Sequence, residues 1–92
     1  MITKFKHKGL RAFFESDTLK GIQPTHQQRL RLLLNALNGA RTLGDLNRPG
    51  FALHPLQGKL KVRWSLRVRA NWRLTFEFED GNVVDLDDED YH

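Results

Sequence analysis

The fold is decided by the stretch KVRWSLRVRANWRLTFEF, which covers residues 61–78. Apolar and polar residues alternate along its two halves, and this period of two is that of a β-strand with one buried face. Ala70–Asn71 suits a tight turn between the halves, so the pattern predicts an antiparallel hairpin. The residues predicted to face the core are Trp64, Leu66, Val68, Trp72, Leu74, Phe76 and Phe78.

The other face of this hairpin is predicted to be strongly cationic. Its arginines are Arg63, Arg67, Arg69 and Arg73. Like charges on neighbouring strands repel each other unless an anion lies among them, and the planar guanidinium group pairs well with phosphate. We therefore predict a phosphate-binding face. The alternative is a solvated face whose charge is balanced by the acidic end of the chain.

Two helices are predicted before the hairpin. Between Pro24 and Gly39, leucines recur at the spacing of one helical face, with proline near the start and glycine at the end. This leucine stripe is too short for a coiled coil and is expected to form part of the core. Residues 9–15 show a shorter helical pattern. His26, in the first turn of the leucine helix, is expected to be exposed.

The remaining segments predict strands and, with them, the fold class. Strands are expected at residues 2–6, at residues 51–56, where Pro55 suggests an edge strand or a strand end, and near the end, where Val84 and Leu86 would face the core. Two N-terminal helices packed on one face of a small, mainly antiparallel sheet give an α+β fold. Residues 1–92 leave room for one core, so a single domain is predicted. A binding site is expected on the open sheet face.

The composition argues against a metal centre and against a membrane protein. The chain has no cysteine, and its four histidines lack the clustering of a zinc site, so we expect no metal or other cofactor. No apolar stretch is long enough to span a membrane, and lysines interrupt residues 1–14, where a signal peptide would need an apolar core. A cytoplasmic location is therefore expected.

The charge is divided unevenly along the chain. All fifteen Lys and Arg residues lie between Lys4 and Arg73, whereas eight of the eleven acids lie between Glu77 and Asp90. Residues 1–76 contain only three acids and carry a formal charge of +12. Such a body suits a polyanion, because each neutralised phosphate releases condensed counterions. The charge pattern therefore favours RNA as the binding partner.

Candidate catalytic residues occur at two places, His54 and the closing Asp90-Tyr91-His92. RNA cleavage without a metal needs a base for the 2′-hydroxyl proton, an acid for the departing 5′-oxygen and cations for the phosphorane. Histidine, tyrosine and acid are the residue types for this chemistry. By themselves they also fit a solvated chain end and a histidine at the end of a strand.

Several short motifs resemble those of the HigB toxins in the RelE/ParE superfamily, and they occur in the family's order over the whole chain. They are Phe5–Leu10, Leu46–Arg48, Leu53–Leu56, Trp64–Ser65, Val68–Arg73 and Asp90–His92. The resemblance implies a toxin of a type II toxin–antitoxin pair that cleaves mRNA in the ribosomal A site and inhibits translation. It also implies metal-independent catalysis and neutralisation by a helix-turn-helix antitoxin of the HigA type.

The resemblance also implies a role for each matching residue. His54 and His92 would be the acid and base, Asp90 would orient or support them, Tyr91 would stack on or position the nucleotide, and Arg73 would contact the scissile phosphate. The negative charges that precede His92 favour its imidazolium form, so we predict that it is the general acid. His54, which is nearer the arginines, suits the base.

Further phosphate contacts are expected from basic residues near the hairpin. The resemblance makes Arg69 a second phosphate candidate. Relatives often carry lysine in the turn after Leu56, where this chain has Gln57. Lys59 or Lys61 could replace that cation.

Two other functions are compatible with the sequence. ParE-like members of the superfamily poison DNA gyrase on the same fold without a nuclease site, and a basic RNA-binding or ribosome-binding module would need no catalysis at all. His54 and the Asp-Tyr-His ending favour the nuclease. In a non-catalytic module, Arg73→Ala would weaken binding, whereas His92→Ala would leave all activity intact.

Overall fold

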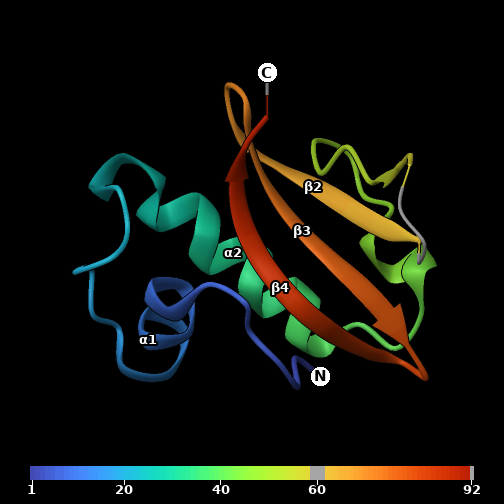
Figure 1. Ribbon diagram of the computed structural model, residues 1–92, viewed down its shortest axis with the longest axis horizontal. Helices are drawn as coiled ribbons and strands as arrows, with labels where there is room; N and C mark the ends of the chain where they lie inside the picture. Colours follow the sequence, from blue (N-terminus) through green and yellow to red (C-terminus); the bar gives the residue numbers. More distant parts are fainter. Residues whose placement is uncertain (59–61, 92) are drawn as a thin grey trace.

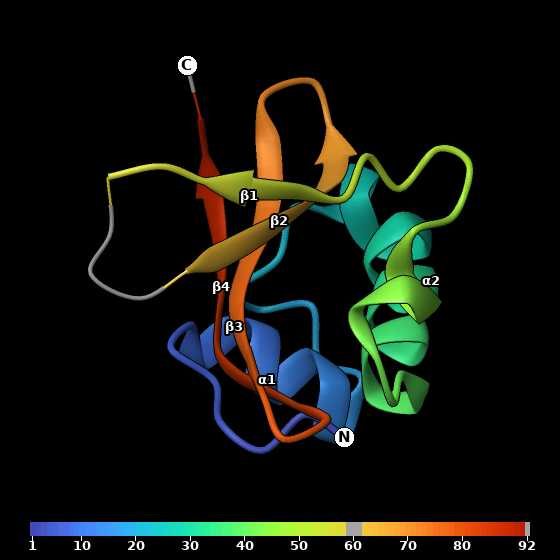
Figure 2. The ribbon, with the colours of Figure 1, turned by 90° about the vertical axis from the view of Figure 1, so that its right-hand side faces the viewer.

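The computed structural model describes residues 1–58 and 62–91 and shows an α+β fold, as predicted. The four strands form one antiparallel sheet in the order β1-β2-β3-β4, and α2 lies against one face of it (Figures 1 and 2). The elements are α1 (Lys8–Ser16), η1 (Pro24–His26), α2 (Gln27–Gly39), η2 (Leu43–Leu46), β1 (His54–Leu56), β2 (Arg63–Arg69), β3 (Trp72–Glu79) and β4 (Asn82–Asp90).

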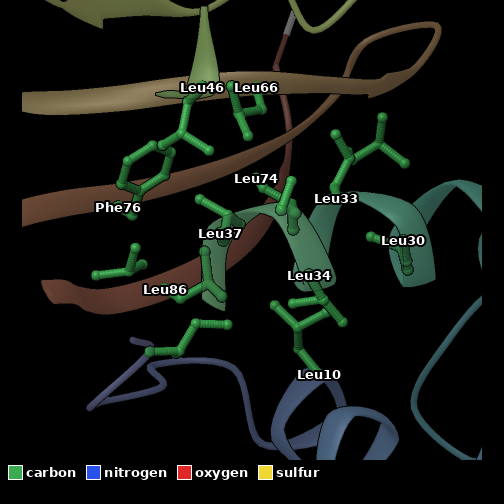
Figure 3. Close-up of a cluster of buried hydrophobic side chains, with 14 of the residues drawn as sticks. Leu10, Leu30, Leu33, Leu34, Leu37, Leu46, Leu66, Leu74, Phe76 and Leu86 are labelled. Atoms are coloured by element: carbon green, nitrogen blue, oxygen red, sulfur yellow. The ribbon is translucent and has the colours of Figure 1, made fainter. Parts of the chain in front are cut away.

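The core lies between α2 and the sheet. The leucine stripe of α2 is buried as predicted, and it meets apolar side chains from β2, β3 and β4 on one side and Leu10 of α1 on the other (Figure 3). Burying one such side chain stabilises the fold by about 1.5–3 kcal/mol. The stripe residues and their sheet partners in the figure are Leu30, Leu33, Leu34, Leu37, Leu66, Leu74, Phe76 and Leu86.

Helix α1 begins at a histidine cap. Nδ1 of His7 accepts a hydrogen bond of 2.9 Å from the backbone N–H of Leu10, which satisfies one of the free donors of the first turn. The helix ends at Asp17, which adopts a left-handed conformation and donates its N–H to the carbonyl of Phe13. These caps orient Leu10 and Phe13 into the core.

The strand predicted at residues 2–6 is reduced to two isolated parallel bridges, Ile2 with Val83 and Phe5 with Leu86. Between the bridged positions of β4, Asp85 adopts a left-handed conformation with φ 52°, and the register of β3 and β4 shifts there. The bulge interrupts the ladder with the N-terminal segment. It also shifts the alternation of β4, so that Val83 is fully buried, and the prediction that Val84 faces the core is wrong.

The edge strand predicted at residues 51–56 is shorter than expected. Only His54–Leu56 pairs with β2, because Gly50 and Ala52 adopt left-handed conformations with φ 84° and 53°. Its place at the sheet edge is confirmed. Proline is tolerated within it because an edge strand leaves one row of backbone groups unpaired.

A carboxylate is partly buried on the helical face of β4. Asp88 pairs with Leu74 across the ladder, and its Oδ1 atom has no hydrogen-bond partner among the described residues. Burial raises the pKa of Asp88 to about 6; His7 opposes this shift, and the charges of Asp87 and Glu89 add to it. The folded protein therefore holds this proton at pH values where the unfolded chain releases it.

We expect Asp88→Asn to stabilise the protein at pH 8. Between the ordinary pKa of 3.8 and the raised value of about 6, the folded state binds more protons, so the wild-type free energy of unfolding falls as pH rises through this window. The variant should gain about 1–3 kcal/mol at pH 8 and little at pH 4. Urea unfolding at both pH values measures the difference. The same change at the exposed Asp80 is the control, and equal gains for both variants would contradict the assignment.

Candidate functional site

Three of the predicted site residues line one hollow on the open face of the sheet. His54, Arg73 and Tyr91 lie around it, where β1, the β2–β3 turn and the end of β4 meet at one end of the sheet (Figure 2). Its volume of about 480 Å³ falls among sites that hold small molecules, roughly 300–1,000 Å³. The other lining residues are Ala52, Leu56, Ser65 and Asn71.

The register of β1 places His54 on this face. His54 pairs with Ser65, and Ser65 pairs with Thr75, so the three side chains share one row across the sheet. The Ser65 hydroxyl donates to the His54 carbonyl at 3.5 Å. The imidazole is exposed at the sheet edge. A histidine in this position can accept a proton from a bound ligand.

Arg73 and Arg67 lie directly opposite each other on the same face. Nη1 of Arg73 donates to the carbonyls of Ala70 and Trp72, at 2.9 and 3.1 Å. These bonds fix the guanidinium beside the β2–β3 turn, and because the group has five N–H donors, others can reach an anion. Arg73 lines the hollow, and Arg67 adds a second positive charge at the same pair position.

Tyr91 is tied to the same turn by its backbone. Its N–H donates to the carbonyl of Asn71 at 2.8 Å, which continues the pairing of β3 and β4 past the end of the strand. The side chain is 37% exposed and lines the hollow. An aromatic ring held in this way can stack on a base.

Asp90 lies on the opposite face. It pairs with Trp72, and paired residues in an antiparallel ladder direct their side chains to the same side of the sheet. Trp72 packs edge-on against His26, with ring centroids 5.6 Å apart, on the helical side. The structure thus does not bring Asp90 and His54 together. The role of Asp90 beside His92 stays a prediction, because His92 lies outside the described residues.

The predicted placement of Arg69 on the open face is wrong. The register of β2 and β3 shifts between Arg67 and Arg69, so that Arg69 pairs with Trp72 and takes its face. The extra residue of this bulge, Val68, reverses the alternation beyond it. In agreement with this placement, the pKa of His26 is lowered by burial and, secondarily, by the charge of Arg69.

Arg63 lies on the open face but is held in a network away from the hollow. It forms an ion pair with Glu77 at 3.4 Å and donates to the Thr75 hydroxyl at 3.1 Å and the Asp85 carbonyl at 3.0 Å. Its side chain is only 15% exposed. Thr75 donates in turn to Glu89. Charge balance by the acidic end therefore applies to this part of the face, and it extends to Arg73, because Glu89 pairs with Arg73 across the β3–β4 ladder. Arg67, which pairs with Arg73 from the other side, leaves that row with an excess of positive charge.

Three further candidates cannot be placed. Lys59 and Lys61, predicted as phosphate contacts, and His92, predicted as the general acid, lie outside the described residues. Among residues 1–58 and 62–91, no group of three or more His, Asp or Glu side chains has the arrangement of a metal site. In the same ranges no helix has the length and apolar character needed to cross a membrane.

Sequence reasoning missed two polar lining residues and misjudged one histidine. Asn71 was assigned only to a turn, and Ser65 only to the cationic face, although both line the hollow. The position of Asn71 between the strands that carry the arginines was a usable signal. His26, expected to be exposed, is 4% exposed because Trp72 covers it.

Comparisons with known proteins agree with the family resemblance of the sequence motifs. A family model described as the RelE-like toxin HigB of type II toxin–antitoxin systems matches residues 3–92. Endoribonuclease HigB of Proteus vulgaris is 45% identical over 92 residues, the full length of both chains. Toxin HigB-1 of Vibrio cholerae serotype O1 is 35% identical over 83 residues, which cover 88% of this chain and 87% of that protein.

Proposed function

This chain belongs to the family of HigB-like toxins of type II toxin–antitoxin systems, and from that premise we propose that it is an endoribonuclease that cuts mRNA in the ribosomal A site. Cleavage there inhibits translation until an antitoxin binds. The convergence of His54, Arg73 and Tyr91 in one hollow is the observation that supports this function best. These residues provide a proton acceptor, a phosphate ligand and an aromatic ring for stacking, and the hollow between them is large enough for a nucleotide.

The proposed reaction is an internal transfer at phosphorus. His54 takes the proton of the 2′-hydroxyl, and the 2′-oxygen attacks the adjacent phosphorus to form a 2′,3′-cyclic phosphate. The bond to the 5′-oxygen breaks, and His92 gives that oxygen a proton. Arg73 stabilises the charge that gathers on the phosphorane oxygens. Tyr91 holds the base beside the cleaved bond, and these residues need no cofactor for the step.

The electrostatics of the face suit this substrate. Arg67 pairs with Arg73, which lines the hollow, and Glu89 pairs with Arg73 from the other side, while Glu77 is paired with Arg63. The row of two arginines and one glutamate has a net positive charge, so a phosphate chain is attracted to the end of the face that holds His54. Binding of this kind weakens steeply as salt concentration rises.

Cleavage of a ribosome-bound mRNA tests the proposal. Purified protein is incubated with the mRNA alone and with the mRNA on ribosomes, and a matched mRNA carries a 2′-deoxy nucleotide at the cut. Cleavage only on ribosomes, loss of cleavage with the 2′-deoxy substrate and a 2′,3′-cyclic phosphate on the product are expected. Ribosome binding without cleavage would indicate a non-catalytic module. Neither binding nor cleavage, with inhibition of DNA gyrase instead, would indicate a ParE-like poison.

A toxin of a type II pair has an antitoxin partner. We propose that this partner is a HigA-like helix-turn-helix protein and that both act in the cytoplasm. Co-expression of such a protein encoded beside the toxin should restore growth and yield a complex on purification. A neighbouring protein that binds the toxin and leaves cleavage unchanged would contradict the neutralising role.

A substitution at Gln57 is expected to increase the cleavage activity. Gln57 is exposed directly after β1, at the position where the family resemblance leads us to expect a lysine. We expect Gln57→Lys to raise the single-turnover rate roughly threefold to tenfold, because an added cation near the phosphate stabilises the transition state. Gln57→Met keeps the side-chain length without the charge and should leave the rate unchanged. An unchanged rate in Gln57→Lys would mean that no cation is missing, as expected if Lys59 or Lys61 already supplies it.

A further inference from the structure

Arg29 lies on α2, outside the hollow. It contacts both strand β2, which carries Arg67, and the loop that leads to His54. We propose that Arg29 is a positioning residue for the cleavage reaction, which holds the segment leading to His54 against the strand that carries Arg67. The inference rests on the proposed function and adds a residue that does not itself touch the RNA.

The contacts of Arg29 join three elements. Its Nη2 atom donates to the carbonyl of Gly50 at 2.6 Å and to that of Arg67 at 2.9 Å, and its Nε atom donates to the Arg67 carbonyl at 3.2 Å. One guanidinium thus connects the helix, the loop before β1 and strand β2. The planar fork of arginine suits two carbonyls at once, and the point charge of lysine does not.

These bonds replace a missing piece of the sheet. Strand β1 begins at His54, so Arg67 lies beyond the end of the β1–β2 ladder. Its N–H donates to the carbonyl of Phe51 at 2.9 Å, and its carbonyl accepts from Arg29. Phe51 and Arg29 therefore satisfy the backbone groups that a longer β1 would pair.

The loop needs such support because its backbone is unfavourable by itself. Ala52 has φ 53°, a left-handed conformation that costs an alanine roughly 1–2 kcal/mol. Phe51, only 4% exposed, is packed under the guanidinium groups of Arg29 and Arg48, each 5.5 Å from its ring centroid. His54 follows three residues later, in a strand with only three paired residues. Its position depends on this anchored loop.

The chain offers matched controls. Arg48 stacks on the same ring, but its Nε atom donates to the Asp45 carbonyl and not to Gly50 or Arg67. Arg31 lies on the same helix and pairs with the exposed Asp17. Arg48→Ala and Arg31→Ala remove the same charge without removing the link, and both should cleave mRNA at the wild-type rate.

The test compares Arg29→Ala, Arg29→Lys and Arg29→Gln with the wild type on mRNA-programmed ribosomes. We expect Arg29→Ala and Arg29→Lys to lower the single-turnover rate at saturating ribosomes roughly tenfold to hundredfold, because a displacement of about 1 Å can cost that much. The half-saturating ribosome concentration should change less than about threefold, since phosphate contacts remain. Arg29→Gln, which keeps one planar donor nitrogen, should lie between, and added ethylguanidinium should partly restore Arg29→Ala.

A structural readout keeps the inference separate from the proposed function. Hydrogen exchange at the Arg67 amide should accelerate at least about tenfold in Arg29→Ala, and the imidazole resonances of His54 should shift, while the far-UV circular dichroism stays native. These measurements hold even if the wild type does not cleave RNA, an outcome that would refute the proposed function alone. Unchanged exchange and resonances, a rate as low in Arg48→Ala, or weaker ribosome binding at an unchanged rate would overturn the positioning role.

Discussion

His54→Ala is expected to lower the single-turnover rate of mRNA cleavage on ribosomes by roughly 10²–10⁴-fold, the usual contribution of a general base. The imidazole lines the hollow beside Arg73 and Tyr91, and among the described residues it is the histidine on the open face. Because the side chain is exposed on an edge strand, the free energy of unfolding of the variant should lie within about 0.5 kcal/mol of the wild-type value. Rapid mixing at saturating ribosomes measures the chemical step directly.

His7→Asn is the matched histidine control. Asparagine can accept the same hydrogen bond from Leu10 and therefore keeps the cap of α1. Its cleavage rate should equal that of the wild type. A rate above one tenth of the wild type in His54→Ala would show that His54 is not the general base, and His92 would then be the next candidate for this role.

Phe76→Ala is expected to lower the free energy of unfolding by about 3–5 kcal/mol. The ring has no exposed surface and lies at the centre of β3, close to Leu37 and Leu46 (Figure 3). Small domains have a total stability of about 5–15 kcal/mol, so the variant should be unfolded to a large extent near physiological temperature. Urea unfolding at 10 °C, where part of the variant remains folded, measures the loss.

The half-buried Phe78, two residues further along the same strand, is the control. Phe78→Ala removes the same atoms from a site that solvent already reaches, so it should cost about 1–2 kcal/mol. Equal losses in the two variants would mean that burial against α2 does not hold the sheet in place.

The sequence predicted the faces of the hairpin but not its irregularity. Leu66 and Leu74 are fully buried, as the alternation requires. The bulge could not be recognised from the alternation of polar and apolar residues. Its extra residue, Val68, is apolar and stands where a regular strand would place a core residue. Arg69 was therefore assigned to the wrong face, and the same kind of shift at Asp85 exchanged the roles of Val83 and Val84.

The candidate site was predicted in its residue types and only partly in its geometry. The motifs identified His54, Arg73 and Tyr91, which the fold brings together from β1, β3 and the residue after β4. The pairing of β4 with β3 directs Asp90 to the other face, and this depends on register, which one sequence does not specify. The support from Arg29 could not be predicted, because it depends on a contact 38 residues apart in the chain.

The core and the hollow occupy opposite faces of one thin sheet, and this separation has a genetic consequence. Substitutions on the helical face should relieve toxicity by lowering the amount of folded protein in the cell. Substitutions at His54 or Arg73 should relieve it while the protein accumulates to normal levels. A selection for surviving cells, combined with measurement of protein abundance, would divide the positions of the chain into these two sets. Along a regular strand the two sets should alternate from one residue to the next. At the bulges in β2 and β4 this alternation should be interrupted.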